Sequence, residues 1–208
     1  MRDEHFAPRQ FVGMESDDTH RRRRAAKWKG ISTVYQQAAM SDLNALLRIQ
    51  NDRELFHRVR DWIVAAKCEP MESYNSYSSR LSEGERSVIL AWGFVAETTN
   101  GGIYQFLTNA TGDCAEETRE AMHRIGATLA AKALDATREV LFGGKPIPSD
   151  PMLREDILSA WDVKHGKGSA NKFLDKYDGD LYEGENGEIE SVEKAIAGYI
   201  RDHYEMFG

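Results

Sequence analysis

The stretch LSEGERSVILAWGFVAETTNGG, residues 81–102, decides the fold class of this chain. Ser82 and Glu85 have the spacing of a capping box, in which the serine oxygen accepts a free backbone N–H and the glutamate reaches back to the cap. Apolar residues then recur every three or four positions, as on the buried face of an α-helix: Val88, Ile89, Trp92, Val95 and Ala96. The Asn-Gly-Gly triplet predicts a helix end, because glycine adopts left-handed backbone angles without a side-chain penalty. We expect Gly101 to have such angles.

The same period recurs from about Val34 to the C-terminus. Asp150 before Pro151 predicts a capped helix start with proline in the first turn. On that helix we expect Leu153, Ile157 and Trp161 to face inward. No alternating run of β-branched residues exceeds four, so strand signals are almost absent. We therefore predict an all-α protein, with a single compact domain of seven to nine helices.

Two further local signals complete the fold prediction. Asp113 stands three residues before Glu116, which predicts another N-terminal cap. Residues 1–30 lack an apolar period and contain the run His-Arg-Arg-Arg-Arg at 20–24. We interpret them as a flexible basic tail attached to a helical domain that spans residues 31–208. A disordered leader and a nucleic-acid-binding arm both fit this tail.

Composition narrows the class of protein. The 208 residues carry a net charge of −7, and residues 150–208 alone account for a net −7, whereas residues 1–30 are at +3 and residues 31–149 at −3. Cys68 and Cys114 form no disulfide framework, so a reducing cytoplasm is the expected location. No run of about 18 apolar residues predicts a membrane span, and no apolar stretch predicts a secretory signal.

Motifs that carry chemistry are missing from the sequence. None of the six histidines pairs with another at the i+3 or i+4 spacing of a metal site, and the acidic stretch from Asp175 to Glu188 fails the calcium-loop pattern. The Gly143-Gly144-Lys145 triplet lacks the rest of a phosphate-binding loop, and no nucleophile elbow is present. We therefore predict a protein that is not an enzyme and has no catalytic residues, no metal and no cofactor.

The strongest local pattern is the corner between Asn100 and Asp113, where polar side chains and three glycines join two helices. One interpretation is a polar groove that holds a peptide or small ligand. The other is a tight structural corner whose amides satisfy the free backbone groups at helix ends. The pattern residues are Asn100, Gly101, Gly102, Tyr104, Gln105, Phe106, Asn109 and Gly112.

The second pattern is an acidic band near the C-terminus, accompanied only by Lys176 and Lys194. It either keeps the protein soluble or substitutes for the phosphates of DNA in binding a basic partner. Composition alone favours the first interpretation. The band consists of Asp175, Asp178, Asp180, Glu183, Glu185, Glu188, Glu190 and Glu193.

Residues 81–207 resemble the bacterial DNA-mimic protein family, in its C-terminal domain of unknown function. The residues that carry the resemblance are Leu81-Ser82-Glu83-Gly84-Glu85, the corner pattern given above, Ile125-Gly126-Ala127, Phe142-Gly143-Gly144, Pro146-x-Pro148-x-Asp150 and Tyr199-Ile200-Arg201-x-His203. The resemblance implies a compact helical fold, self-association as a homodimer, and no catalytic activity. The basic run at residues 20–24 departs from a mimic's expected character.

The leading hypothesis is an acidic, non-catalytic binding protein that engages the basic surface of a DNA-binding protein or regulator. It predicts no direct contact with nucleic acid or membrane. One alternative is an immunity or antitoxin-like inhibitor of a toxic enzyme. Another is a small-ligand binder built on the corner from Asn100 to Asp113.

Overall fold

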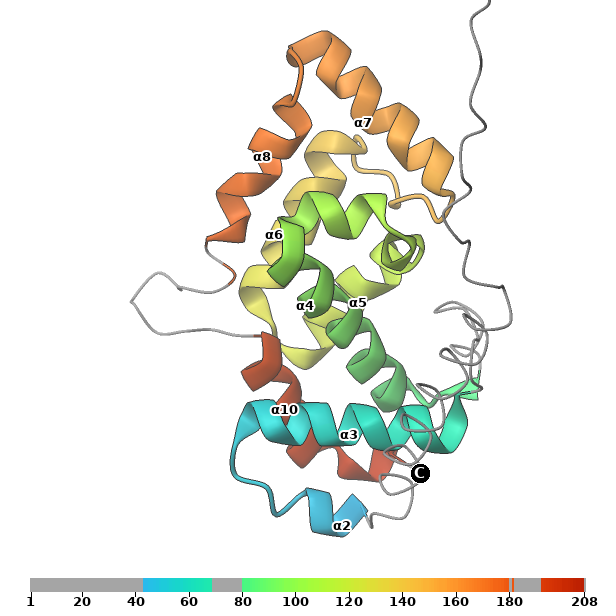
Figure 1. Cartoon of the computed structure of the whole chain (residues 1–208), viewed down its shortest axis with the longest axis vertical. Coiled ribbons are helices and arrows are strands. Elements are labelled where there is room, and N and C mark those ends of the chain that lie inside the picture. The colour runs from blue at the N-terminus through green and yellow to red at the C-terminus, as the bar shows by residue number, and fades with distance from the viewer. Residues whose placement is uncertain (1–42, 69–79, 180, 182–191, 208) are drawn as a thin grey trace, which may run out of the picture.

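The computed structural model describes residues 43–68, 80–179, 181 and 192–207, and all regular structure within these ranges is helical (Figure 1). The all-α prediction is therefore confirmed. The α-helices are α2 (Leu43–Leu46), α3 (Asp52–Lys67), α4 (Glu83–Thr108), α5 (Ala115–Ile125), α6 (Thr128–Leu141), α7 (Pro151–His165), α8 (Ser169–Asp178) and α10 (Val192–Asp202), with 3-10 turns η2 (Ala110–Cys114) and η3 (Tyr204–Met206). The expected tail lies outside the described residues.

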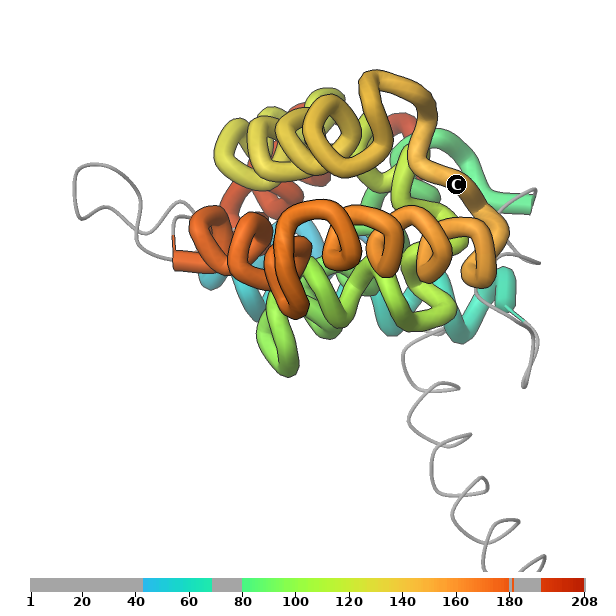
Figure 2. Tube along the Cα trace, turned by 90° about the horizontal axis from the view of Figure 1, so that it is seen from above, coloured from blue at the N-terminus to red at the C-terminus, as the bar shows by residue number. Residues whose placement is uncertain are grey.

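Helix α4 is the centre of the fold. It packs against α3, α5, α8 and α10 and also contacts α7. Helices α3 and α10 lie together across one end of α4, whereas α7 and α8 form a hairpin over the other end (Figure 1). Seen from above, the hairpin has α6 on one side and α4 on the other (Figure 2). No helix in the described ranges is long and apolar enough to cross a membrane.

Side-chain caps mark the starts of α3, α4 and α7. The Asn51 side chain accepts the Glu54 N–H at 2.9 Å at the start of α3. The capping box of α4 is complete, since Ser82 and Glu85 exchange both bonds. Asp150 accepts two backbone N–H groups at the start of α7, with proline in the first turn. The caps expected at Ser82 and Asp150 are confirmed.

The core is made by side chains from every long helix. Their burial supplies the main favourable term for folding, at about 25 cal/mol per Å² of apolar surface removed from water. Fully buried members include Leu55, Phe56, Val59 and Ile63 of α3, Val88, Phe94, Ile103, Phe106 and Leu107 of α4, Met122 of α5, Leu134 of α6, Leu174 of α8 and Ile196 and Ile200 of α10.

Helix α7 turns a different face inward from the one that its apolar pattern predicts. Leu153 is 48% exposed, so its expected burial is wrong, while Ile157 and Trp161 are half-buried. The residues that α7 buries are Leu158 and Arg154, which is only 1% exposed. The guanidinium of Arg154 therefore takes the inward position that the pattern assigns to Leu153.

Arg154 is buried because its guanidinium finds acceptors from three segments. Its Nε donates to the Leu107 carbonyl at 2.8 Å, and its Nη1 donates to the carbonyls of Pro148 and Ser149 at 2.8 and 2.9 Å. Its Nη2 donates to the Asp113 carboxylate at 2.7 Å. A buried charge is tolerated only when it is paired and hydrogen-bonded in this way.

The N-terminal cap expected at Asp113 is wrong. Helix α5 begins at Ala115 with no side-chain cap, and Asp113 lies within η2. Its carboxylate accepts a hydrogen bond from Arg154 Nη2. The cap spacing is present in the sequence, but α5 begins two residues after Asp113, with Cys114 at the cap position.

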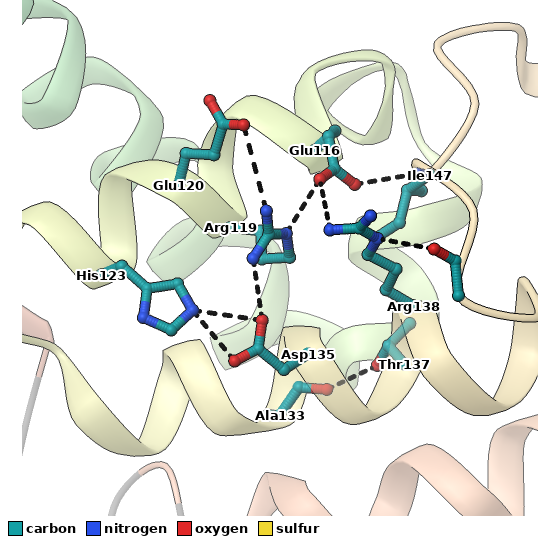
Figure 3. A network of polar contacts seen from close by, with 10 residues as sticks. Glu116, Arg119, Glu120, His123, Ala133, Asp135, Thr137, Arg138 and Ile147 are labelled. Carbon is teal, nitrogen blue, oxygen red and sulfur yellow. Dashed lines mark hydrogen bonds and ion pairs between the residues drawn. The ribbon is translucent and has the colours of Figure 1, made fainter.

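A network of charged side chains joins α5 to α6 (Figure 3). Arg119 contacts Glu116 and Asp135, each at 2.9 Å, and His123 Nε2 lies 2.9 Å from the Asp135 carboxylate. Glu116 also accepts the Ile147 N–H at 2.9 Å, which ties the loop after α6 to α5. The network thus fixes how α5, α6 and this loop meet.

We expect Arg154→Met to lower the free energy of unfolding by roughly 3–5 kcal/mol, because it leaves Asp113 and several carbonyls without their donor. Chemical denaturation followed by circular dichroism measures the loss. Arg53→Met is the control: Arg53 is 74% exposed and 3.6 Å from Glu193, so it should cost no more than about 0.5 kcal/mol. Equal costs would contradict the role of Arg154.

Asp135 gives a pH-dependent prediction. Although burial raises the pKa of Asp135, hydrogen bonds from His123 and Arg119 lower it below its usual value. Such a group stabilises the fold above its unfolded pKa of about 3.9, and the contribution is lost as pH falls through the lower folded pKa. Asp135→Asn should therefore lower the urea midpoint at pH 7, and this effect should disappear as pH falls through the lowered pKa of the folded state. Glu139→Gln, an exposed change on the same helix, should show no such trend.

Candidate functional site at the break in helix α4

The Asn-Gly-Gly triplet interrupts α4 without ending it. Gly101 and Gly102 have non-helical backbone angles, and helical geometry resumes at Ile103 and continues to Thr108. The expected helix end is therefore a break within one longer element. A break of this kind leaves backbone N–H groups at the start of the second part without intrahelical acceptors.

The left-handed glycine is Gly102, so the expectation for Gly101 is wrong. Gly102 has φ 72° and ψ −174°, a region that only glycine occupies readily. Gly101 has φ −164°, which other residues adopt. Glycine at 101 serves a different purpose, since a Cβ there would lie 2.3 Å from Gln105 Oε1.

Asp178 at the end of α8 satisfies the broken end of α4. Its Oδ1 accepts the Ile103 N–H at 3.0 Å, and a Cβ on Gly102 would lie 2.1 Å from its Oδ2. Burial raises the pKa of Asp178; the Ile103 hydrogen bond opposes that rise and the nearby charge of Asp175 adds to it. Asp178 is thus an internal cap for the second part of α4.

The other corner residues divide into packing and polar groups. Phe106 is buried edge-to-face against Phe94, with ring centroids 5.1 Å apart, and Tyr104 is half-buried. Gly112 is in close backbone contact, since a Cβ there would lie 2.7 Å from two carbonyl oxygens. The Asn100 side chain donates to the Ala96 carbonyl at 2.8 Å. These residues shape the corner.

Gln105 and Asn109 point to the outer surface of α4 and share one acceptor. Gln105 Nε2 and Asn109 Nδ2 each donate to Glu97 Oε2 at 2.7 Å. Glu97 and Gln105 are half-buried, whereas Asn109 is exposed. The bonds cross the break, because Glu97 precedes the glycines and both amides follow them.

Three of the eight acidic-band residues are described, and they have different surroundings. Asp175 is exposed and Asp178 is the internal cap. The Glu193 side chain is 18% exposed and lies 3.6 Å from both Arg53 and His57 of α3. Asp180, Glu183, Glu185, Glu188 and Glu190 lie outside the described residues.

Most other described carboxylates are bound within the fold. Ion pairs between helices join Asp52 to Arg201, Glu83 to Arg124, Glu85 to Lys67, Asp113 to Arg154 and Glu117 to Arg86. On the hairpin, by contrast, Glu155, Asp156 and Asp175 are exposed with no cationic partner among the described side chains. In the same part of the chain, no group of three His, Cys, Asp or Glu is arranged to hold a metal ion.

The family model for DMP19-like protein, a DNA-mimic family, matches residues 79–203. The chain belongs to this family. The match covers most of the range over which the sequence resembles the DNA mimics, so that resemblance is confirmed. Neither a curated protein nor a solved structure matches the chain.

The sequence patterns do not identify two residues that make important contacts in this DMP19-like domain. Arg154 is a charged residue that is buried between apolar neighbours, and no local spacing reveals its partners. Glu97 precedes the corner but belongs to it, because it shares one outer face of α4 with Gln105 and Asn109. The hydrogen bonds to Glu97, and not a helical period, identify this face, because the backbone between Glu97 and the two amides is not helical at Gly101 and Gly102.

Gly102→Ala should lower the free energy of unfolding by roughly 2–4 kcal/mol, because the new methyl group strains the backbone and displaces Asp178. Thermal and urea unfolding measure the change. Gly126→Ala is a matched control, since Gly126 has φ 74° and no atom lies within 4 Å of the position that a Cβ would take. It should cost only the backbone strain, about 1 kcal/mol. Equal losses would show that the Asp178 contact adds nothing.

Proposed function

We propose that this DMP19-like protein is a non-catalytic DNA mimic that binds the basic surface of a DNA-binding protein. The observation that carries the proposal is the difference between its carboxylates. Most carboxylates of the central helices form ion pairs within the fold. Glu155, Asp156 and Asp175 on the α7–α8 hairpin are instead exposed, and none of them forms an ion pair with a described side chain. The hairpin leads directly into the acidic band.

The arrangement of charge along the hairpin supports this assignment. Lys164 lies in the last turn of α7, Lys167 in the loop and Lys172 in the first turn of α8, whereas the unpaired carboxylates lie farther along the two helices. Lys176 is the exception on α8, and its ammonium lies 5.8 Å from the centre of the Phe173 ring, where it contributes to packing. The negative parts of these two helices are therefore the surfaces that we assign to a basic partner.

Binding through exposed carboxylates has a recognisable salt dependence. Charges more than about 8 Å apart are screened at physiological ionic strength, so the association rate should fall as salt rises. The protein itself should not bind duplex DNA, which carries one negative charge per about 1.7 Å of axis and repels an acidic body.

We predict that the protein releases DNA-binding proteins from immobilised duplex DNA that has been loaded with a bacterial lysate. Replacing Asp175 by Asn and both Glu183 and Glu185 by Gln should raise the concentration needed for half-release roughly tenfold. The full chain is used throughout, and released protein is quantified by mass spectrometry. Asp178 is left unchanged because it caps α4.

The control removes three charges elsewhere, by Glu54→Gln, Glu139→Gln and Asp202→Asn. All three residues are exposed and have no ion pair among the described side chains. This variant should release as much protein as the parent. No release by the parent, or equal release by both triple variants, would overturn the proposal.

A further inference from the structure

Glu97, Gln105 and Asn109 form a polar site on the outer face of α4. An ionised carboxylate only accepts hydrogen bonds, so both amide nitrogens face Glu97 and the amide oxygens are directed elsewhere. Gln105 Oε1 lies toward Gly101, whose missing Cβ leaves room for it. The two amides thus hold the Glu97 carboxylate in one orientation.

The charge of Glu97 is not neutralised within the described structure. Both of its donors are neutral amides that bond to Oε2, and none of the described Lys, Arg or His side chains is within ion-pair distance of it. Glu85 and Glu116, also in the helical body, each have a cation. A half-buried carboxylate that is oriented but uncompensated is prepared to accept a charged donor, because the cost of ordering it has already been met.

We propose that Glu97, held in place by the side-chain amides of Gln105 and Asn109, binds the guanidinium of an arginine on the partner protein. A guanidinium is the best fit, because it is planar, presents five donors and is less strongly hydrated than an ammonium at a half-buried site. The identity of the partner rests on the proposed function, whereas the cation site itself does not. This site is separate from the acidic band in sequence.

The test is a titration of the full-length, nitrogen-15-labelled protein with L-argininamide. The side-chain amide signals of Gln105 and Asn109 should shift in a saturable manner. Glu97→Gln keeps an acceptor oxygen for both amides but removes the charge, and it should weaken this response at least about tenfold. Glu54→Gln makes the same change at an exposed site on α3 and should leave the response unchanged.

A second variant tests the proposal independently, in case Glu97→Gln does not fold. Asn109→Ser acts at an exposed position, removes one of the two amides that orient Glu97 and should weaken the Gln105 response about threefold. Signals that do not move in the parent, or that move equally in Glu97→Gln or in Asn109→Ser, would overturn the proposal. The triple variant at Asp175, Glu183 and Glu185 should keep the full argininamide response. Failure of DNA-binding-protein release with an intact response therefore overturns only the proposed function.

Discussion

The helical segment from Ile103 to Thr108 is held at its two ends by oppositely charged side chains of the α7–α8 hairpin, Asp178 and Arg154, which together form a clamp. Asp178 accepts the first amide of the segment, and Arg154 donates to the Leu107 carbonyl near its end. The signs match the helix dipole, which favours an anion at the N-terminus and a cation at the C-terminus. The break in α4 and the docking of the hairpin are thus one structural feature, because each supplies what the other needs.

The clamp also separates the two interpretations of the corner. The inner side of the corner is architectural, since Gly102 contacts Asp178 and Phe106 packs in the core. On its outer side, Glu97 is half-buried and Asn109 is exposed. A polar contact surface and a structural corner are therefore compatible on opposite sides of one broken helix. The clamp fixes the positions of the outer side chains, because it fixes the backbone that carries them.

Short-range chemistry explains how much of this fold can be predicted from sequence. The caps at Asn51, Ser82 and Asp150 depend on residues within three positions, so their spacing is sufficient. The bond from Ile103 to Asp178 joins residues 75 positions apart, and no periodicity encodes it. The same limit explains Leu153 and Asp113. Arg154 faces the core because the Leu107 carbonyl accepts its Nε–H, and the Asp113 carboxylate accepts its Nη2–H. Only the fold brings these two acceptors, which are distant in sequence, next to Arg154.

Each carboxylate counts equally toward the net charge, but the carboxylates differ in whether they have a partner within the fold. Asp178 and Glu193 count toward the acidic band, yet one caps a helix and the other lies beside two basic groups of α3. Only charges without an internal partner can attract a basic surface over a distance, because a paired charge presents mainly a dipole. On the α7–α8 hairpin, the described carboxylates that remain available to a basic partner are therefore Glu155, Asp156 and Asp175. Net charge alone overstates the number available.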